Sequence, residues 1–238
     1  MRFYVPLPLA DGCEIPLPDD VAHHLVRVLR AEAGTRLALF NGDGGTWEAE
    51  LVEVGKKSAV ARLLAHTADS RQSPLATHLG QVMSKGDRMD YAIQKATELG
   101  VTDITPLTSE RCELRLRGEE RADKKLEHWR RIAISACEQC GRSIPPRIHE
   151  PEALSAWSAT VKADLRLVLA PSVEGALPDA HVQSVALLIG PEGGLSDTEI
   201  AAVRGQGFRP WQLGPRIMRT ETAPVAALAL LQARFGDL

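Results

Sequence analysis

From Leu75 onward, short apolar runs alternate with longer amphipathic runs, and this alternation is the strongest constraint on the fold. The apolar runs predict strands at 79–83, 104–107, 165–169, 185–189 and 211–213. The amphipathic runs predict helices at 87–99 and 119–140, and Ser196 with Glu199 forms a capping box that begins another helix. After residue 221, Thr222 is predicted to cap a last helix, with Pro224 in its first turn. Strands separated by helices are typical of a mostly parallel sheet covered on both faces, so we predict an α/β fold for residues 73–238.

The first seventy residues follow a different pattern, which indicates a small, mainly β domain over residues 1–72. A helix is predicted from 19 to 33, capped by Asp19 or Asp20 and ended by Gly34, with an apolar stripe of Val21, Leu25, Val28 and Leu29. Strands are predicted at 36–40, 46–54 and 58–64, and Asn41-Gly42 is a turn signal between the first two. Residues 67–74 are polar and without periodicity, so we interpret them as a linker.

The overall composition limits the possible function classes. Hydrophobic residues make up 44% of the chain and charged residues 25%, and no apolar run approaches the roughly 20 residues that a membrane span needs. Pro6 comes before any stretch of secretory length, so we expect a cytoplasmic protein that does not bind a membrane. A net charge of −3 argues against a protein that coats nucleic acid with its whole surface, but it permits a local basic face.

The four cysteines are too few and too scattered for a disulfide scaffold in a chain of 238 residues. Cys137 and Cys140 have the spacing of half a zinc site, but no second pair of cysteines or histidines accompanies them. On the predicted helix 119–140 they are neighbours one turn apart. We therefore expect reduced thiols that pack in the interior, and no metal site.

Two loops rich in glycine and proline follow predicted strands near the C-terminus. The first holds Gly190, Pro191, Glu192, Gly193 and Gly194, and the second runs from Leu213 to Thr222. Glycines allow close approach of a ligand to the main chain, and two such loops in a short interval predict one ligand pocket. Neither the Walker pattern nor a Gly-x-Gly-x-x-Gly turn occurs, and Glu192 would repel a phosphate. A cationic ligand with apolar surfaces, such as S-adenosylmethionine, fits these loops better than a nucleoside triphosphate.

Several separated motifs carry a resemblance to a known family. They are Lys85-Gly86-Asp87-Arg88-Met89-Asp90, residues 94–101 (QKATELGV), residues 137–142 (CEQCGR), the loop of residues 190–194 and residues 213–222. In this order they resemble the small-subunit (16S) ribosomal RNA uracil-N3 methyltransferase family, which belongs to the SPOUT class. The N-terminal part, with residues 24–30, is similar to the PUA-like RNA-binding domain of that family. The resemblance covers essentially the full length.

The resemblance implies an enzyme with S-adenosylmethionine as cofactor, a trefoil knot in the C-terminal sheet and a homodimer. The implied cofactor-contacting residues come from three loops: Leu169, Ala170, Ile189, Gly190, Pro191, Glu192, Gly193, Gly194, Leu213, Gly214, Ile217, Met218 and Thr222. Arg219 is the candidate that stabilises negative charge on a uracil carbonyl oxygen, with an ion pair to Glu221 as the competing interpretation. Glu221 either orients this arginine or accepts the proton from N3, and the reaction needs no metal.

The implied partner is small-subunit ribosomal RNA, either free or within the assembled subunit. Candidate phosphate contacts are His23, His24, Arg27, Arg30, Lys85, Arg88 and Arg142, since such contacts position an RNA without reading its sequence. Two alternatives stay open at this point. One is a methyltransferase of the same class that acts on ribose 2′-O or on transfer RNA, and the other is a non-catalytic RNA-binding assembly factor.

Overall fold

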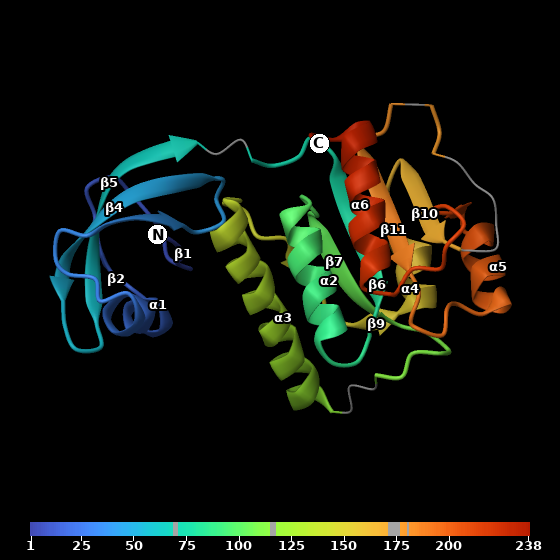
Figure 1. Ribbon diagram of the computed structural model, residues 1–238, viewed down its shortest axis with the longest axis horizontal. Coiled ribbons are helices and arrows are strands. Elements are labelled where there is room, and N and C mark those ends of the chain that lie inside the picture. Colours follow the sequence, from blue (N-terminus) through green and yellow to red (C-terminus); the bar gives the residue numbers. More distant parts are fainter. Residues whose placement is uncertain (69–70, 115–117, 171–176, 180) are drawn as a thin grey trace. The chain divides into compact units, whose positions relative to one another are not determined.

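The computed structural model describes residues 1–68, 71–114, 118–170, 177–179 and 181–238. The chain divides into two units, and each is described by itself (Figure 1). The first unit comprises Met1–Gln72 together with Cys137–Pro145, and the second comprises Ser73–Ala136 and Pro146–Leu238. The sequence pattern does not indicate that Cys137–Pro145 groups with the N-terminal residues. Two predicted linker positions, 69 and 70, lie outside the described residues.

A five-stranded sheet forms the first unit, in the order β1-β3-β4-β5-β2. Its strands are β1 (Arg2–Tyr4), β2 (Glu14–Pro16), β3 (Arg36–Phe40), β4 (Gly45–Val54) and β5 (Ala59–Ala68). All neighbours pair antiparallel except β1 and β3, which are parallel. The three predicted strands are confirmed, and β5 extends four residues beyond its predicted end. Strands β1 and β2 were not predicted, because three residues are too few to show alternation.

The helix predicted at 19–33 is shorter and differs in kind. Helix α1 (Asp19–His23) passes directly into one π-helical turn, η1 (His24–Val28), and Arg30 then takes a positive φ of 52°. Pro18 precedes the helix in place of an aspartate cap. A π turn widens the helix and rotates the following side chains away from the 3.6-residue stripe. As a result Val28 is 61% exposed and Leu29 41% exposed, so their predicted place on the buried stripe is wrong.

The second unit contains a seven-stranded parallel sheet, which confirms the predicted α/β fold. Its order is β12-β10-β11-β6-β7-β8, and β9 also pairs with β7. The strands are β6 (Ala76–Val82), β7 (Asp103–Thr108), β8 (Arg147–Ile148), β9 (Glu152–Ala153), β10 (Leu165–Leu169), β11 (Ser184–Ile189) and β12 (Arg209–Trp211). Every pair in this sheet is parallel. Strand β12 begins two residues before its predicted start and contains Pro210, which is tolerated because β12 is an edge strand.

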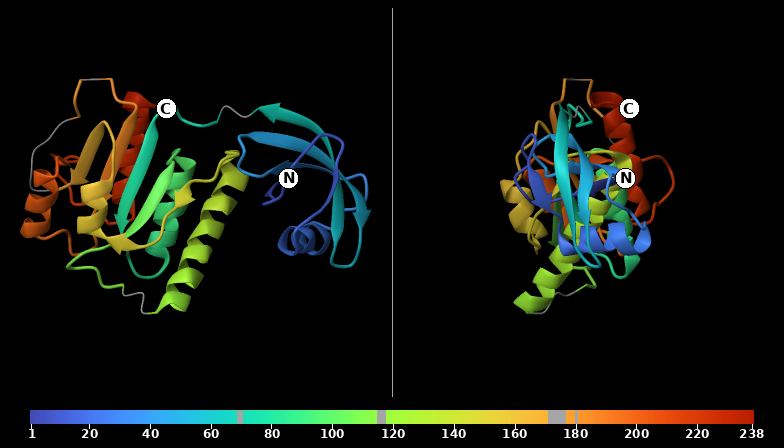
Figure 2. Two further views of the ribbon diagram at one scale, coloured as in Figure 1. Left: turned by 180° about the vertical axis from the view of Figure 1, so that it is seen from behind. Right: turned by 90° about the vertical axis from the view of Figure 1, so that its left-hand side faces the viewer.

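Helices cover both faces of this sheet. They are α2 (Asp87–Glu98), α3 (Glu119–Cys140), α4 (Leu154–Thr160), α5 (Asp197–Gly205) and α6 (Thr222–Phe235). Helices α2 and α6 pack against each other, and α4 lies on the opposite face of the sheet (Figures 1 and 2). The bounds of α3 match the predicted helix, whereas α4 was not predicted. The capping box of Ser196 and Glu199 is present at the start of α5, but α6 begins at Thr222 with Glu221 as its cap residue.

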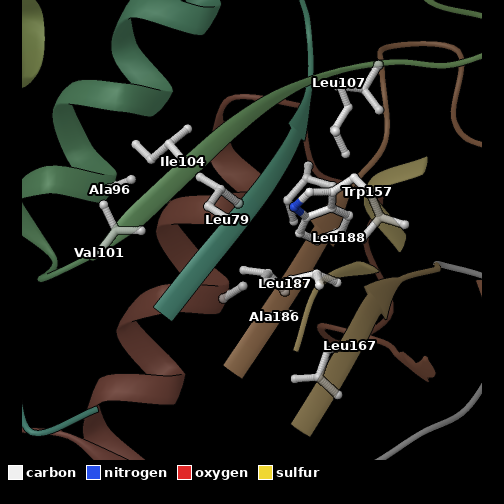
Figure 3. Close-up of a cluster of buried hydrophobic side chains, with 14 of the residues drawn as sticks. Leu79, Ala96, Val101, Ile104, Leu107, Trp157, Leu167, Ala186, Leu187 and Leu188 are labelled. Atoms are coloured by element: carbon white, nitrogen blue, oxygen red, sulfur yellow. The ribbon is translucent and has the colours of Figure 1, made fainter. Parts of the chain in front are cut away.

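The core of the second unit joins these helices to the sheet. Figure 3 shows part of it, with Ala96 from α2 and Trp157 from α4 among strand residues such as Leu79, Ile104 and Leu187. Gly80 of β6 lies directly under Trp157, because a Cβ at this glycine would stand 2.5 Å from the indole ring. Within the described residues, no helix is long and apolar enough to cross a membrane.

Candidate active site

Three neighbouring strands of the parallel sheet end at the same edge. Strands β10 and β12 pair so that Leu169 lies beside Trp211, and β11 is the other neighbour of β10. Parallel strands place their carboxyl ends at one edge, where ligands of open α/β sheets bind. The chain segments that follow Leu169, Ile189 and Trp211 therefore start close together, and the two predicted loops belong to this edge.

These segments enclose a cavity of about 530 Å³. Twelve of the residues that the resemblance assigns to the cofactor line it: Leu169, Ala170, Ile189, Gly190, Pro191, Glu192, Gly193, Gly194, Leu213, Gly214, Ile217 and Met218. Thr222 does not line this cavity and instead lines a neighbouring one. The fold thus brings together twelve residues that the sequence predicted as one set.

The lining joins apolar side chains to exposed main chain. Leucine and isoleucine side chains from all three segments supply the apolar surface, while Gly194 and Gly214 take φ values of +70° and +72°. Positive φ is accessible to glycine without strain, so these turns depend on the missing side chain. A volume of this size and a mostly apolar wall with main-chain donors and acceptors are typical of small-molecule sites. The cavity accordingly suits a ligand with apolar surfaces and a few polar edges.

A buried hydrogen-bond chain links the two loops to the centre of the sheet. The hydroxyl of Thr220 donates to the carbonyl oxygen of Gly190 over 2.9 Å, and it accepts from the side-chain amide of Gln81 over 3.1 Å. The same amide also donates to the carbonyl oxygen of Val82. Gln81 is 1% exposed and Thr220 is 6% exposed, so water does not compete for these bonds. These hydrogen bonds fix the distance between the glycine loop and the segment that precedes α6.

The glycine loop is also held from its outer side. Arg111 donates to the carbonyl oxygen of Gly193 over 2.9 Å, and the guanidinium of Arg88 pairs with the carboxylate of Glu192 at 2.6 Å. The hydrogen bond with Glu192 raises the pKa of Arg88. Because both partners are partly exposed, we regard this pair as a positioning contact and not as a large source of stability.

Arg219 and Glu221 lie on two sides of one tight turn. Amides of Thr222 and Ala223 donate to the carbonyl oxygen of Arg219, so the turn is closed by the main chain. Arg219 is exposed at the cofactor-side cavity, and no ion pair joins it to Glu221 or to any other described residue. The competing interpretation of an Arg219–Glu221 ion pair is therefore not supported by the described part of the chain. One carboxylate oxygen of Glu221 is buried without a hydrogen-bond partner.

A second, open hollow of about 900 Å³ lies beside the first cavity. Its lining residues are Lys85, Gly86, Asp87, Arg88, Tyr91, Glu113, Glu221 and Thr222. They come from the start of α2, from the start of α6 and from the segment after β7. The two cavities share the turn at residues 219–223, because Arg219, Thr220 and Ala223 line one of them while Glu221 and Thr222 line the other.

The candidate RNA-contacting residues are distributed over both units. His23, His24, Arg27 and Arg30 are exposed on the helical segment of the first unit. In the second unit, Lys85 pairs with Glu113 at 2.7 Å, and Arg88 pairs with Glu192. Arg142 is 4% exposed and donates to the side chain of Gln72, so the expectation of a surface phosphate contact does not hold for this residue. Its position after α3 gave no sequence signal of burial.

Sequence reasoning missed several residues of the site. Gln81 is the one polar side chain of the predicted strand 79–83, and this placement is a signal that could have identified it. Tyr91 and Arg111 carry no local pattern, because Tyr91 lines the hollow and Arg111 reaches the carbonyl oxygen of Gly193 only through the packing of separate elements. No group of three or more histidine, cysteine, aspartate or glutamate side chains in the described ranges could hold a metal ion. Cys137 is buried, and its hydrogen bond with Cys140, together with burial, raises the pKa of its thiol.

Comparisons with known proteins agree with this architecture. Residues 71–232 match the RNA methyltransferase domain family, and residues 17–64 match the RNA methyltransferase PUA domain family. Ribosomal RNA small subunit methyltransferase E of Buchnera aphidicola subsp. Schizaphis graminum is 39% identical over 241 residues, which cover 100% of this chain and 97% of the Buchnera protein.

Two solved structures are similar over the whole chain. A Legionella pneumophila protein, solved in complex with the bound cofactor SAM, has 43% identity and a TM-score of 0.96, with 100% of this chain and 98% of that chain covered. Ribosomal RNA small subunit methyltransferase E from Neisseria gonorrhoeae, bound to S-adenosyl methionine, has 38% identity and a TM-score of 0.92 over the same shares. The resemblance found in the sequence motifs is confirmed, and this chain belongs to the ribosomal RNA small subunit methyltransferase E family of RNA methyltransferases.

Proposed function

We propose that this protein transfers a methyl group from S-adenosylmethionine to N3 of a uracil in small-subunit ribosomal RNA. The observation that carries the proposal is the cavity at the ends of β10, β11 and β12, which gathers twelve residues of the expected cofactor loops. Relatives of the same family have been crystallised with this cofactor bound. We also propose the trefoil knot and the homodimer that the family resemblance implies, and the cytoplasmic location expected from the sequence.

The residues present fit the cofactor. Bound S-adenosylmethionine supplies a methyl group on a positively charged sulfur, and a site for it needs apolar walls and main-chain groups for the adenine edge. Leu169, Ile189 and Leu213 offer the apolar walls, and the glycine loop brings main chain without bulky side chains to the cavity. Glu192 also lines the cavity, but its carboxylate pairs with Arg88 at 2.6 Å, which partly offsets the attraction that the sequence predicts between Glu192 and a cationic ligand.

Arg219 and Glu221 are the residues that we assign to the chemistry. Uracil N3 loses a proton during methylation, and the electron density that builds up on the ring spreads to the carbonyl oxygens. The guanidinium of Arg219 is without an ion-pair partner among the described residues, so it is available to stabilise that charge. The buried, unpartnered carboxylate oxygen of Glu221 favours its role as proton acceptor over a role in orienting Arg219.

The test is a nucleoside analysis of ribosomal RNA treated with the purified protein and the cofactor. We expect N3-methyluridine in 16S RNA, and a ribose-methylated nucleoside or no product would contradict the proposal. Arg219→Ala should lower the rate of methyl transfer by at least about a hundredfold, because an oxyanion-type donor is removed, while cofactor affinity stays within about twofold. Arg204→Ala is the matched control, since Arg204 is exposed on α5 and lines neither cavity.

The form of the RNA substrate and the oligomeric state need their own measurements. Parallel reactions with free 16S RNA and with assembled small subunits will show which of them is methylated. Sedimentation of the purified protein tests the homodimer, and a monomer at micromolar concentration would contradict it. A catalytically silent RNA-binding factor would bind S-adenosylhomocysteine in calorimetry and produce no methylated nucleoside from either substrate.

A further inference from the structure

We propose that the open hollow beside the cofactor cavity is the subsite for the acceptor base, with Tyr91 as the stacking surface and Glu221 as the base that takes the N3 proton. This inference rests on the proposed function. It adds a location for the substrate, and it assigns a role to a tyrosine that no motif identifies.

The position of the hollow is the first argument. Arg219 and Thr220 line the cofactor cavity, and the next residue, Glu221, lines the hollow. Consecutive Cα atoms are about 3.8 Å apart, so only one turn of main chain separates the two spaces. The ion pair between Arg88 and Glu192 is a second connection between the two spaces, since Arg88 lines the hollow and Glu192 lines the cavity. A base in the hollow therefore lies within reach of a methyl donor in the cavity.

The charges of the hollow select a neutral, polar ligand. Three acidic side chains (Asp87, Glu113 and Glu221) and two basic ones (Lys85 and Arg88) line it, and both basic groups already pair with carboxylates at 2.6–2.7 Å. Among the described residues of this lining, a phosphate would meet an excess of carboxylates and no unpaired cation. Uracil carries no charge and presents both hydrogen-bond acceptors and an N–H donor. The hollow thus suits the base of a nucleotide better than its phosphate.

Tyr91 supplies the flat surface that base recognition uses. It extends from α2 into the hollow and is 46% exposed, so its ring is accessible to a ligand there. The ammonium group of Lys95 lies 6.0 Å from the centre of its ring. Single bases that leave a stack are commonly held against aromatic rings in RNA-binding sites. An acceptor base in this hollow would have Tyr91 as its stacking partner.

Glu221 completes the chemistry. Its side chain lines the hollow, and one of its carboxylate oxygens has no hydrogen-bond partner among the described residues. The N3–H bond breaks and its proton passes to this carboxylate, while N3 forms a bond to the methyl carbon. The bond between that carbon and the sulfonium breaks at the same time, and its electron pair stays on sulfur. The step balances with the two substrates of the proposed reaction and the carboxylate.

The stacking role is tested with Tyr91→Ala and Tyr91→Phe. Loss of the ring should raise the KM for the RNA roughly tenfold, the size expected for one base–aromatic stack, and leave the cofactor dissociation constant unchanged. Phenylalanine keeps the ring and should restore KM to within about twofold. Gln94→Ala is the matched control, because Gln94 is exposed on the same helix and lines neither cavity. Equal KM values for all three variants and the wild type would overturn the stacking role.

A photochemical experiment locates the base directly. RNA carrying 5-bromouridine at the methylated position, which the nucleoside analysis of wild-type reactions first identifies, is irradiated with the full-length protein. We expect cross-links on the peptide that contains Tyr91. Cross-links confined to peptides outside residues 85–91, 113 and 221–222 would overturn the assignment.

The role of Glu221 as the base is tested with Glu221→Gln. This variant should lower kcat by at least about a hundredfold and remove the acidic limb of the pH profile of kcat, while its affinities for RNA and cofactor stay unchanged.

The outcomes separate this inference from the function on which it rests. If wild-type protein makes no N3-methyluridine, the proposed function fails. If it makes N3-methyluridine while the Tyr91 and Glu221 variants behave like wild type, the function stands and the acceptor subsite is wrong.

Discussion

The hydroxyl of Thr220 donates to the carbonyl oxygen of Gly190 over 2.9 Å and thereby ties together two loops that are thirty residues apart in the chain. The same hydroxyl accepts a hydrogen bond from the amide of Gln81, which lies near the C-terminal end of β6. A threonine after an arginine in a loop has no sequence signature of this role. The bond shows that the cofactor loops are positioned from inside the sheet and not only by their own glycines.

We predict that Thr220→Val weakens cofactor binding by about fivefold to fifteenfold, since the carbonyl of Gly190 loses a buried partner worth about 1–1.5 kcal/mol. Thr220→Ser keeps the hydroxyl and should bind within about twofold of wild type. Calorimetric titration with S-adenosylhomocysteine measures both, and Thr198→Val is the control, because Thr198 is exposed on α5. Equal affinity for the valine variant would show that the loops hold their shape without this bond.

The exposed segment at the end of the first unit's helix leads to a second prediction. Arg27 and Arg30 are exposed, and the apolar side chains between them, Val28 and Leu29, are exposed as well. If both arginines contact phosphates, the variant Arg27→Ala with Arg30→Ala should bind RNA more weakly. Each phosphate contact with a single strand contributes about 0.7 to the slope of log affinity against log salt concentration. The magnitude of this slope should therefore fall by about 1.4 in the double variant.

Filter binding or fluorescence anisotropy at four or more salt concentrations measures this slope. Lys56→Ala with Lys57→Ala removes two exposed charges from a turn of the same unit and is the matched control. If the arginine variant and the lysine variant lose affinity equally, the helical segment has no special place in the RNA interface.

The elements predicted correctly are those whose own residues determine them. The 22-residue helix α3 shows its amphipathic period over six turns, and the capping box of Ser196 and Glu199 identifies the start of α5. The strands β1, β2, β8 and β9 have two or three residues each, too few for a period to be visible, and helix α4 spans only seven. These elements form because neighbouring strands offer hydrogen bonds, which is information outside their own sequence.

The residues of the site that could be predicted from the sequence are likewise those whose own residue type determines their conformation. The loops rich in glycine and proline could be predicted to form a pocket, because left-handed and turn conformations of the backbone favour these residue types. The π turn at His24–Val28 depends on tertiary packing, and the helical period across it misplaced Val28 and Leu29. Arg142 is buried and Tyr91 is exposed for reasons that involve distant elements, so residue type alone predicts the reverse of both.

The contact between Gly80 and Trp157 gives a stability prediction. A Cβ at position 80 would stand 2.5 Å from the indole ring, which is buried in the core of the second unit. Gly80→Ala should therefore lower the free energy of unfolding by about 1–3 kcal/mol, the usual cost of overpacking. Gly205→Ala, where no atom lies within 4 Å of the added carbon, is the control and should be neutral or slightly stabilising. Chemical denaturation compares the two, and an unchanged midpoint for Gly80→Ala would mean that Trp157 moves without cost.

The imidazole of His78 adjoins the same tryptophan and is partly buried. Its Nε2 accepts from the indole N–H of Trp157 over 3.2 Å and lies 2.7 Å from the hydroxyl of Thr105, while the ring of His149 stacks at 5.1 Å. Because an indole N–H can only donate, Nε2 carries no proton in this arrangement. Burial, opposed by the charge of Asp103 and assisted by His149, lowers the pKa of His78 to about 4.

This pKa shift predicts how stability depends on pH. In the unfolded chain His78 takes up a proton near pH 6.5, whereas in the folded chain it does so only near pH 4. Above pH 6.5 both states are neutral and the full stability is present, and as the pH falls from 6.5 towards 4 the unfolded state gains protons first and stability is lost. Between pH 7.5 and pH 5 the contribution of this group is a loss of about 2 kcal/mol. His78→Gln removes the titration, so its free energy of unfolding should fall by about 2 kcal/mol less than that of wild type over this interval. Urea unfolding at the two pH values measures the difference, and parallel losses in both proteins would show that His78 is protonated in the folded state.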